Sequence, residues 1–203
     1  MYRVKRSNLV YKSEWMALYE DLVNNEKKGT TATFNRIIVQ DAVIIVPIFA
    51  DGSLLMVESY RHGTGTNLLE LPGGLINEKE ELPDDAAKRE LLEETGYASH
   101  TLELDNWFYS WPGRATQKNF VFVAKGLNKI AKQNLEDFEY AKVYVISREQ
   151  ITQEIKNGKI KSAITISALL HGCSFENNNL MSSTTEVLTH NIVKNLPQIL
   201  YGK

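Results

Sequence analysis

Alternating polar and apolar positions dominate the first forty residues of the chain. The stretches "WMALYEDLV" and "TFNRIIVQ" follow this pattern, and the turn-like "NNEKKG" at 24–29 separates them. An alternation with a period of two is typical of a strand that is buried on one side only. The pattern therefore predicts a hairpin or a small antiparallel sheet, an N-terminal β extension that covers residues 1–40.

The next apolar segment is continuous instead of alternating. "AVIIVPIF" and "LLMVESYR" flank "ADG" at 50–52, which is a hairpin signal. An unbroken apolar run indicates a strand that is covered on both faces. Further segments rich in β-branched and aromatic residues follow, namely "NWFYSWPG", "NFVFVAKGL" and "EYAKVYVIS".

Helical patterns are inserted between these strands and appended to them. Pro83 suits the first turn of one helix and Gly96 suits the position just past its end. A capping-box pattern at Ser147 and Gln150 opens a second helix. That helix should stop near Gly158, and two more are expected over about 161–171 and 184–201.

Strands in the first two thirds, with helices inserted or appended, indicate a mixed α/β sandwich over residues 41–203. The chain of 203 residues is 43% hydrophobic, enough to bury a core. Its net charge of −2 gives no general attraction to nucleic acid. The single cysteine, Cys173, excludes an internal disulfide framework.

No segment resembles a membrane span or a secretory signal. The longest apolar run, "AVIIVPIFA" at 42–50, is far shorter than the eighteen or so residues that a transmembrane helix needs. The basic N-terminus lacks the apolar core of a signal peptide. We therefore expect a cytoplasmic protein with no membrane partner.

One stretch, "LPGGLINEKEELPDDAAKRELLEETGY" at 71–97, is unusually acidic. At 100° per residue, Glu90, Glu93 and Glu94 lie within an arc of about 100° on one helix face. Like charges at this spacing repel each other. A solvated acidic face is one interpretation. The other is a site for a hard divalent cation, since such ions prefer carboxylate oxygens and cancel the repulsion.

The residues around these glutamates resemble the Nudix box, G-x5-E-x7-R-E-U-x-E-E-x-G-U, in which U is a bulky apolar residue. "RELLEETGY" at 89–97 matches its second half, and Glu81 lies at the right distance before Arg89. Six residues instead of five separate Gly74 from Glu81, which leaves Glu80 as the alternative first glutamate. An extra residue in an exposed loop explains this spacing, because loops accept insertions cheaply.

The resemblance implies a Nudix-type α/β/α sandwich with a mixed sheet and hydrolysis of a nucleoside diphosphate linked to another group. It also implies that Mg²⁺ or Mn²⁺ is bound by Glu90, Glu93, Glu94 and the carbonyl of Gly73. Glu90 and Glu93 would then belong to the catalytic set. Gly74, Glu81, Arg89 and Gly96 take the structural positions of the motif.

The sequence before the box resembles that of ADP-ribose pyrophosphatases. There, "SYR" at 59–61 precedes "ELPGG" at 70–74, which makes Arg61 and Glu70 candidates for substrate binding. An arginine fork suits phosphate oxygens, although Arg61 in an ordinary surface salt bridge is the alternative. In "SWPGRAT", Pro112 follows Tyr97 by 15 residues, close to a marker proline of that subfamily. Trp111 could stack on an adenine or serve only in packing.

A loop glutamate before a late strand is the general base that the same resemblance implies. Glu139 lies four residues ahead of Val143, and Glu136 is the competing candidate. A solvated loop acid is the alternative for either residue. The four histidines show no ligand spacing, so none of them is assigned a role.

The expected function is a Mg²⁺-dependent or Mn²⁺-dependent pyrophosphatase for ADP-ribose or a related nucleoside diphosphate sugar. One alternative is a Nudix hydrolase for a dinucleotide or a capped RNA end, and another is a non-catalytic nucleotide-binding regulator. Loss of a box glutamate would favour the regulator, and Glu90, Glu93 and Glu94 are all present. The apolar residues of the N-terminal extension (Trp15, Leu18, Tyr19 and Leu22) predict a homodimer.

Overall fold

Strands cover more residues than helices in the part of the chain that the structure describes, residues 1–77, 81–135 and 140–172 of a computed structural model. The first strands are β1 (Tyr2–Lys12), β2 (Met16–Asn25), β3 (Thr30–Val39), β4 (Ala42–Ile48), β5 (Leu54–Arg61), β6 (Thr66–Glu70) and β7 (Gly73–Leu75). Helix α1 (Pro83–Thr95) comes next. It is followed by β8 (Tyr97–Ala98), β9 (Thr101–Tyr109), β10 (Lys118–Lys125), β11 (Asn128–Lys129), β12 (Ala141–Ile146), α2 (Arg148–Lys156) and α3 (Ala163–Gly172).

The N-terminal extension is a three-stranded antiparallel sheet in the order β1-β2-β3. The predicted turn at 24–29 joins β2 to β3, so the small antiparallel sheet expected from the alternation is confirmed. Asp21 is the one position of β2 that is fully buried. Most other side chains of this sheet are exposed or half-buried, which means that the sheet has no apolar core of its own.

The main sheet is mixed, as predicted. Its strand order is β12-β5-β4-β10-β9, with β6 paired to β5 and β7 paired to β4. Strand β10 runs parallel to β4, whereas the other pairs are antiparallel. The predicted hairpin at 50–52 connects β4 to β5, where Gly52 N donates to Phe49 O at 2.9 Å.

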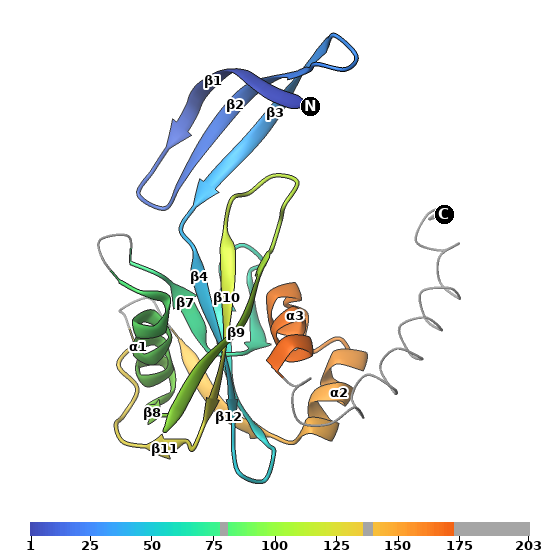
Figure 1. Ribbon diagram of the computed structural model, residues 1–203. Helices are drawn as coiled ribbons and strands as arrows, with labels where there is room; N and C mark the ends of the chain where they lie inside the picture. The colour runs from blue at the N-terminus through green and yellow to red at the C-terminus, as the bar shows by residue number, and fades with distance from the viewer. Residues whose placement is uncertain (78–80, 136–139, 173–203) are drawn as a thin grey trace.

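Helices cover both faces of the main sheet, with α1 on one side and α2 and α3 on the other (Figure 1). Alternate residues of β4 explain this arrangement. Val43 and Ile45 pack in the cluster that contains Leu91 of α1. Val46 and Ile48, two residues apart on the other face of the strand, pack with residues of α2 and α3. The continuous apolar run is therefore buried on both faces, and the α/β/α sandwich is confirmed.

Helix boundaries follow the signals in the sequence closely. Helix α1 begins at Pro83, and Gly96 ends it in the left-handed conformation with φ of 76°. Ser147 caps α2 through a complete capping box with Gln150. The helix predicted over 161–171 is α3. The helix predicted over 184–201 and Cys173 lie outside the described residues.

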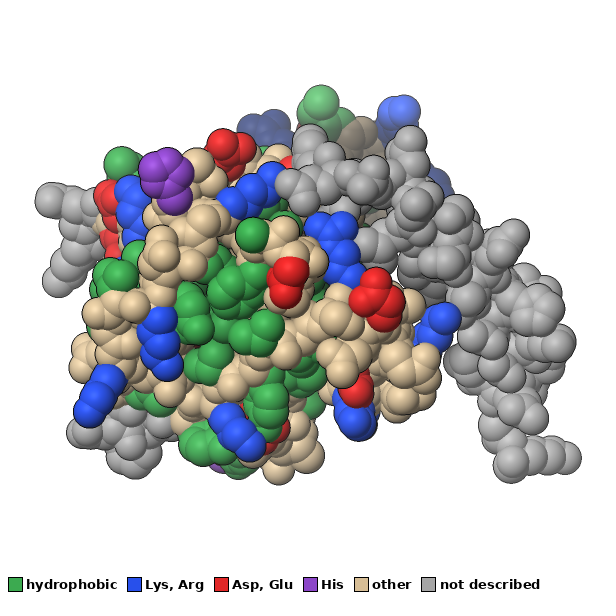
Figure 2. Space-filling view, turned by 90° about the horizontal axis from the view of Figure 1, so that it is seen from below, with side chains coloured by type: hydrophobic (Ala, Val, Ile, Leu, Met, Phe, Trp, Pro, Cys, Tyr) green, Lys and Arg blue, Asp and Glu red, His purple; other side chains and the backbone are tan. Residues whose placement is uncertain are grey.

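The end of the sandwich that lies opposite the N-terminal sheet has an apolar centre. Seen from below, hydrophobic side chains gather in the middle of this face, and charged side chains lie around them (Figure 2). Within the described residues, no helix is both long and apolar enough to span a membrane.

Candidate active site

Helix α1 carries the acidic residues, and its apolar side fixes their direction. Ala86, Ala87 and Leu91 are almost fully buried against the main sheet. Residues three and four apart lie on the same side of a helix. With the apolar side held by the core, Glu90 is turned toward β7, and the guanidinium of Arg89 lies between Glu90 and Glu93.

Arg89 binds oxygens from three different segments. Its Nε donates to Glu81 Oε1 at 2.7 Å, and Nη2 donates to Glu81 Oε2 and to Leu75 O, both at 3.0 Å. Its Nη1 donates to Glu90 Oε1 at 2.7 Å and to Glu93 Oε2 at 3.1 Å. These contacts raise the pKa of Arg89 above its ordinary value, with the bond to Glu81 as the largest cause. One protonated side chain therefore ties the loop, β7 and α1 together.

Glu94 and Glu90 face the glycine pair that opens β7. Gly73 N donates to Glu94 Oε2 at 2.9 Å, and Glu94 is only 8% exposed. A Cβ added to Gly74 would overlap the carboxylate of Glu90, and one added to Gly73 would overlap the backbone oxygen of Val43. The missing Cβ of Gly73 thus lets β4 approach the main chain, and the missing Cβ of Gly74 makes room for the carboxylate of Glu90.

Arg61 and Glu70 form a pair at the ends of β5 and β6. Arg61 Nε donates to Glu70 Oε2 at 2.6 Å, and the side chains are 46% and 10% exposed. Buried Glu70 therefore holds the base of the guanidinium while its outer part faces solvent. A planar fork held in this way suits phosphate oxygens. The salt bridge that the sequence offered as the alternative for Arg61 is therefore present. It does not conflict with substrate binding, because only Nε of the guanidinium contacts Glu70.

The donor set of the box suits a hard divalent cation. Glu90, Glu93 and Glu94 offer carboxylate oxygens and Gly73 adds a main-chain carbonyl, which are the ligands that Mg²⁺ and Mn²⁺ accept. Within the described residues, no group of three or more His, Cys, Asp or Glu side chains is arranged to hold an ion. Instead, positive charge already lies between Glu90 and Glu93 as the guanidinium of Arg89.

A family model described as the NUDIX domain matches residues 39–166, which is more than half of the chain. The chain belongs to the Nudix family. It is a Nudix hydrolase with the box on a loop, α1 and the turn at Gly96. This match runs from the last residue of β3 into the first half of α3 and so contains the whole main sheet.

Several curated proteins are similar to this Nudix chain. An ADP-ribose pyrophosphatase of Bacillus subtilis is 31% identical over 129 residues, covering 63% of this chain and 69% of that protein. The methanol dehydrogenase activator of Bacillus methanolicus is 34% identical over 131 residues, with the same two coverages. A solved structure, "Crystal structure of ADP compounds hydrolase", has a TM-score of 0.74. At 23% identity, covering 83% of this chain and 90% of the other, it supports the fold.

Other predicted site residues lie apart from the box or outside the described residues. Trp111 is 56% exposed in the connection between β9 and β10. Glu80, Glu136 and Glu139 all lie outside the described part of the chain. The contact of Arg89 with Glu81 is compatible with Glu81 as the first glutamate of the box, and it does not test Glu80.

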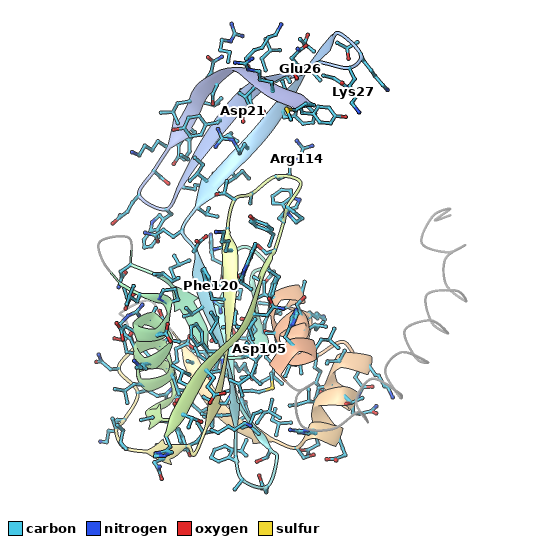
Figure 3. The ribbon with its side chains drawn as sticks, viewed as in Figure 1. Asp21, Glu26, Lys27, Asp105, Arg114 and Phe120 are labelled. Atoms are coloured by element: carbon cyan, nitrogen blue, oxygen red, sulfur yellow. The ribbon has the colours of Figure 1, made fainter. Side chains whose placement is uncertain are left out.

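A cavity of about 380 Å³ lies between the N-terminal sheet and the β9–β10 connection. Figure 3 shows Arg114 at the tip of that connection and Asp21 on the sheet beyond it. Arg36 Nε donates to Asp21 Oδ2 at 2.7 Å and thereby lowers the pKa of Asp21. The lining residues are Asp21, Phe34, Asn35, Arg36, Tyr109, Pro112, Gly113, Arg114, Ala115 and Thr116.

Sequence reasoning did not find this cavity or the supports around the box. A second cavity, of about 700 Å³, lies where β5, β6 and β12 meet α2. Gln133 Nε2 donates to Glu94 O at 2.5 Å and to Ala141 O at 2.8 Å, and Asn134 N donates to Glu93 O at 2.9 Å. The contacts with Glu93 O and Glu94 O satisfy carbonyls at the end of α1, and the contact with Ala141 O links Gln133 to β12. An isolated glutamine in a polar loop carries no sequence signal for such a role.

The ion pair between Glu81 and Arg89 makes stability depend on pH. The bond from Arg89 holds the pKa of Glu81 below its ordinary value of 4.5. A carboxyl whose pKa is depressed in the folded state contributes stability above the unfolded pKa, and this contribution is lost as the pH falls through the folded pKa. We therefore expect Glu81→Gln to lower the melting temperature at pH 7, with a much smaller loss well below pH 4.5.

Thermal unfolding of the variant and the parent between pH 7 and pH 3 measures this difference. Glu103→Gln removes an exposed carboxylate of β9 and serves as the control. If the Glu81 variant lost the same amount of melting temperature at every pH, the ion pair with Arg89 would not be the source of the pH dependence.

Proposed function

We propose that this Nudix hydrolase splits the diphosphate of ADP-ribose, or of a related nucleoside diphosphate sugar, with Mg²⁺ or Mn²⁺. The observation that carries the proposal is the placement of Glu94 against Gly73 N, with Glu90 and Glu93 beside it on α1. These oxygens and the Gly73 carbonyl would hold the cation. When bound, such an ion neutralises charge on the diphosphate and lowers the pKa of an attacking water.

The remaining chemistry falls to side chains of the chain itself. Arg61, fixed at Nε by Glu70, would bind phosphate oxygens through the outer part of its fork. Arg89 would hold the carboxylates of Glu90 and Glu93 in place, because it donates a hydrogen bond to each of them. Glu139 would accept the proton of the attacking water, with Glu136 as the competing candidate. The names of the similar pyrophosphatases support ADP-ribose as the first substrate to test.

A regulator that binds a nucleotide without hydrolysing it is the second candidate. The similarity to the methanol dehydrogenase activator favours it, although the box glutamates of this chain are complete. Hydrolysis of a dinucleotide or a capped RNA end is an alternative within the same reaction class. A panel of nucleoside diphosphate compounds separates the three possibilities.

The decisive experiment measures phosphate release, after phosphatase treatment, from such a panel in Mg²⁺ with the parent and with Glu94→Gln. We expect ADP-ribose to be the best substrate. Turnover should fall at least about a hundredfold in the variant, because one carboxylate oxygen that could bind the cation is replaced by an amide nitrogen. The amide oxygen of Gln can still accept from Gly73 N, so the fold should persist. Near-normal turnover of the variant would exclude the role of Glu94, and an inactive parent would favour the regulator.

The general base is tested by two further variants. Glu139→Gln should lower kcat strongly, leave KM nearly unchanged and remove an acid-side dependence of the rate on pH. Glu136→Gln should then have little effect. The reverse pattern would assign the base to Glu136, and small effects in both would assign it to Glu90 or Glu93.

We also propose that residues 1–40 form a dimerisation element attached to the hydrolase domain at 41–203. The N-terminal sheet exposes large apolar side chains, among them Val4, Leu9, Trp15 and Phe34. Exposed apolar surface of this kind favours burial against a second copy. Light scattering should give twice the chain mass of 23.0 kDa at micromolar concentration. A particle of single-chain mass would contradict a dimer.

A further inference from the structure

The segment that leads from β6 into β7, residues 71–73, is held from three sides. Leu71 N donates to Thr165 Oγ1 of α3 at 3.3 Å. Pro72 O accepts from Ile45 N of β4 at 2.9 Å. Gly73 N donates to Glu94 Oε2 of α1 at 2.9 Å. Three consecutive residues therefore link a helix on one face of the sheet, the central strand and the acidic helix on the other face.

The contact at Thr165 is fully enclosed. Thr165 and Leu71 are each only 2% exposed. Ser162 Oγ accepts from Thr165 N at 3.3 Å, which fixes the first turn of α3 and with it the direction of the threonine side chain. A buried N–H that loses its acceptor is strongly unfavourable, so the hydroxyl of Thr165 determines where Leu71 can lie.

A shift of Leu71 has few free dihedrals in which to relax before it reaches Gly73. Pro72, the residue between them, has a fixed φ and so removes one of the two soft dihedrals at that position. Gly73 itself packs tightly against β4, where a Cβ would overlap the backbone oxygen of Val43. A shift of Leu71 would therefore strain the Gly73 main chain against β4 and disturb its N–H and carbonyl.

We propose that Thr165 is a positioning residue for the metal site, acting from the opposite face of the sheet. Its hydroxyl fixes Leu71 N and, through Pro72, sets the Gly73 main chain against the carboxylate of Glu94. This inference rests on the proposed function, in which Glu94 and the Gly73 carbonyl hold the cation. Thr165 touches neither substrate nor cation and has no chemical step of its own.

The test compares three variants of the full chain. Thr165→Val keeps the shape of the side chain and removes the acceptor, whereas Thr165→Ser keeps the acceptor. Ile151→Val is the control, because Ile151 belongs to the buried cluster that contains Leu71 but lies on α2. Calorimetric titration with Mn²⁺, without substrate, gives the affinity for the cation. The ¹⁵N–¹H signal of Gly73 reports its bond to Glu94, with Glu94→Gln as the reference for a changed acceptor.

We expect Thr165→Val to weaken Mn²⁺ binding roughly tenfold, because mutation of a residue that supports a metal ligand commonly has an effect of this size. It should also shift the Gly73 signal and raise the Mg²⁺ concentration that half-saturates hydrolysis, with less change in the KM for ADP-ribose. Thr165→Ser should restore the parent values. Ile151→Val should lower the melting temperature without weakening Mn²⁺ binding.

The proposal is overturned if Thr165→Val keeps the parent's Gly73 signal and Mn²⁺ affinity, or if Ile151→Val weakens Mn²⁺ binding equally. Should Thr165→Val not fold, Thr165→Ala removes the same acceptor and is judged in the same way. A parent that hydrolyses no compound of the panel refutes the proposed function alone. A shifted Gly73 signal in Thr165→Val would still support the positioning role in that case.

Discussion

The attraction between Arg89 and the carboxylates around it is the interaction on which the site depends. Glu90 and Glu93 would otherwise repel each other on one face of α1. Arg89, whose side chain is 28% exposed, contacts both and also reaches Glu81 and Leu75 O. Because these bonds raise its pKa, Arg89 stays protonated wherever the carboxylates are ionised. The acidic helix is therefore compatible with folding before any cation is present.

A split in the main sheet admits β7, the strand that contacts this cluster through Leu75 O and Gly74. Strands β4 and β5 pair only at Ile48 and Leu54 and then separate, and β6 and β7 fill the gap by pairing with β5 and β4. The chain between β6 and β7 thus crosses the middle of the sandwich, where main-chain groups can reach helices on both faces. The tight approach of Gly73 to β4 and of Gly74 to Glu90 follows from this crossing.

Local signals allowed much of this structure to be predicted from the sequence. Pro83 and Gly96 define the ends of α1 because each acts through its own backbone. Helical spacing placed the three glutamates on one side of the helix, but it could not show that Glu94 turns to Gly73 N while Glu90 and Glu93 contact Arg89. Those directions depend on β7, whose three residues are too few for a strand signal.

Contacts between distant positions could not be predicted in the same way. Leu71 and Thr165 are 94 residues apart, and neither residue type indicates the other. A single threonine near the start of a helix is most simply explained by local capping. Its use as an acceptor for a buried N–H becomes visible only when α3 is placed across the sheet from α1. The support of the site is thus a property of the fold and not of the motif.

The N-terminal sheet shows the same dependence on distant contacts. Its buried position, Asp21, is a charged residue, and it is compatible with burial because Arg36 and Ser7 both donate to it. The sheet is joined to the sandwich by main-chain bonds, from Ile37 N to Arg114 O at 2.8 Å and from Thr116 N to Ile37 O at 3.0 Å. These bonds hold Arg114 and Thr116, which come shortly after Pro112 and Gly113, so the N-terminal sheet supports the position of that turn. The cavity beside it therefore exists only while both parts of the chain are folded together.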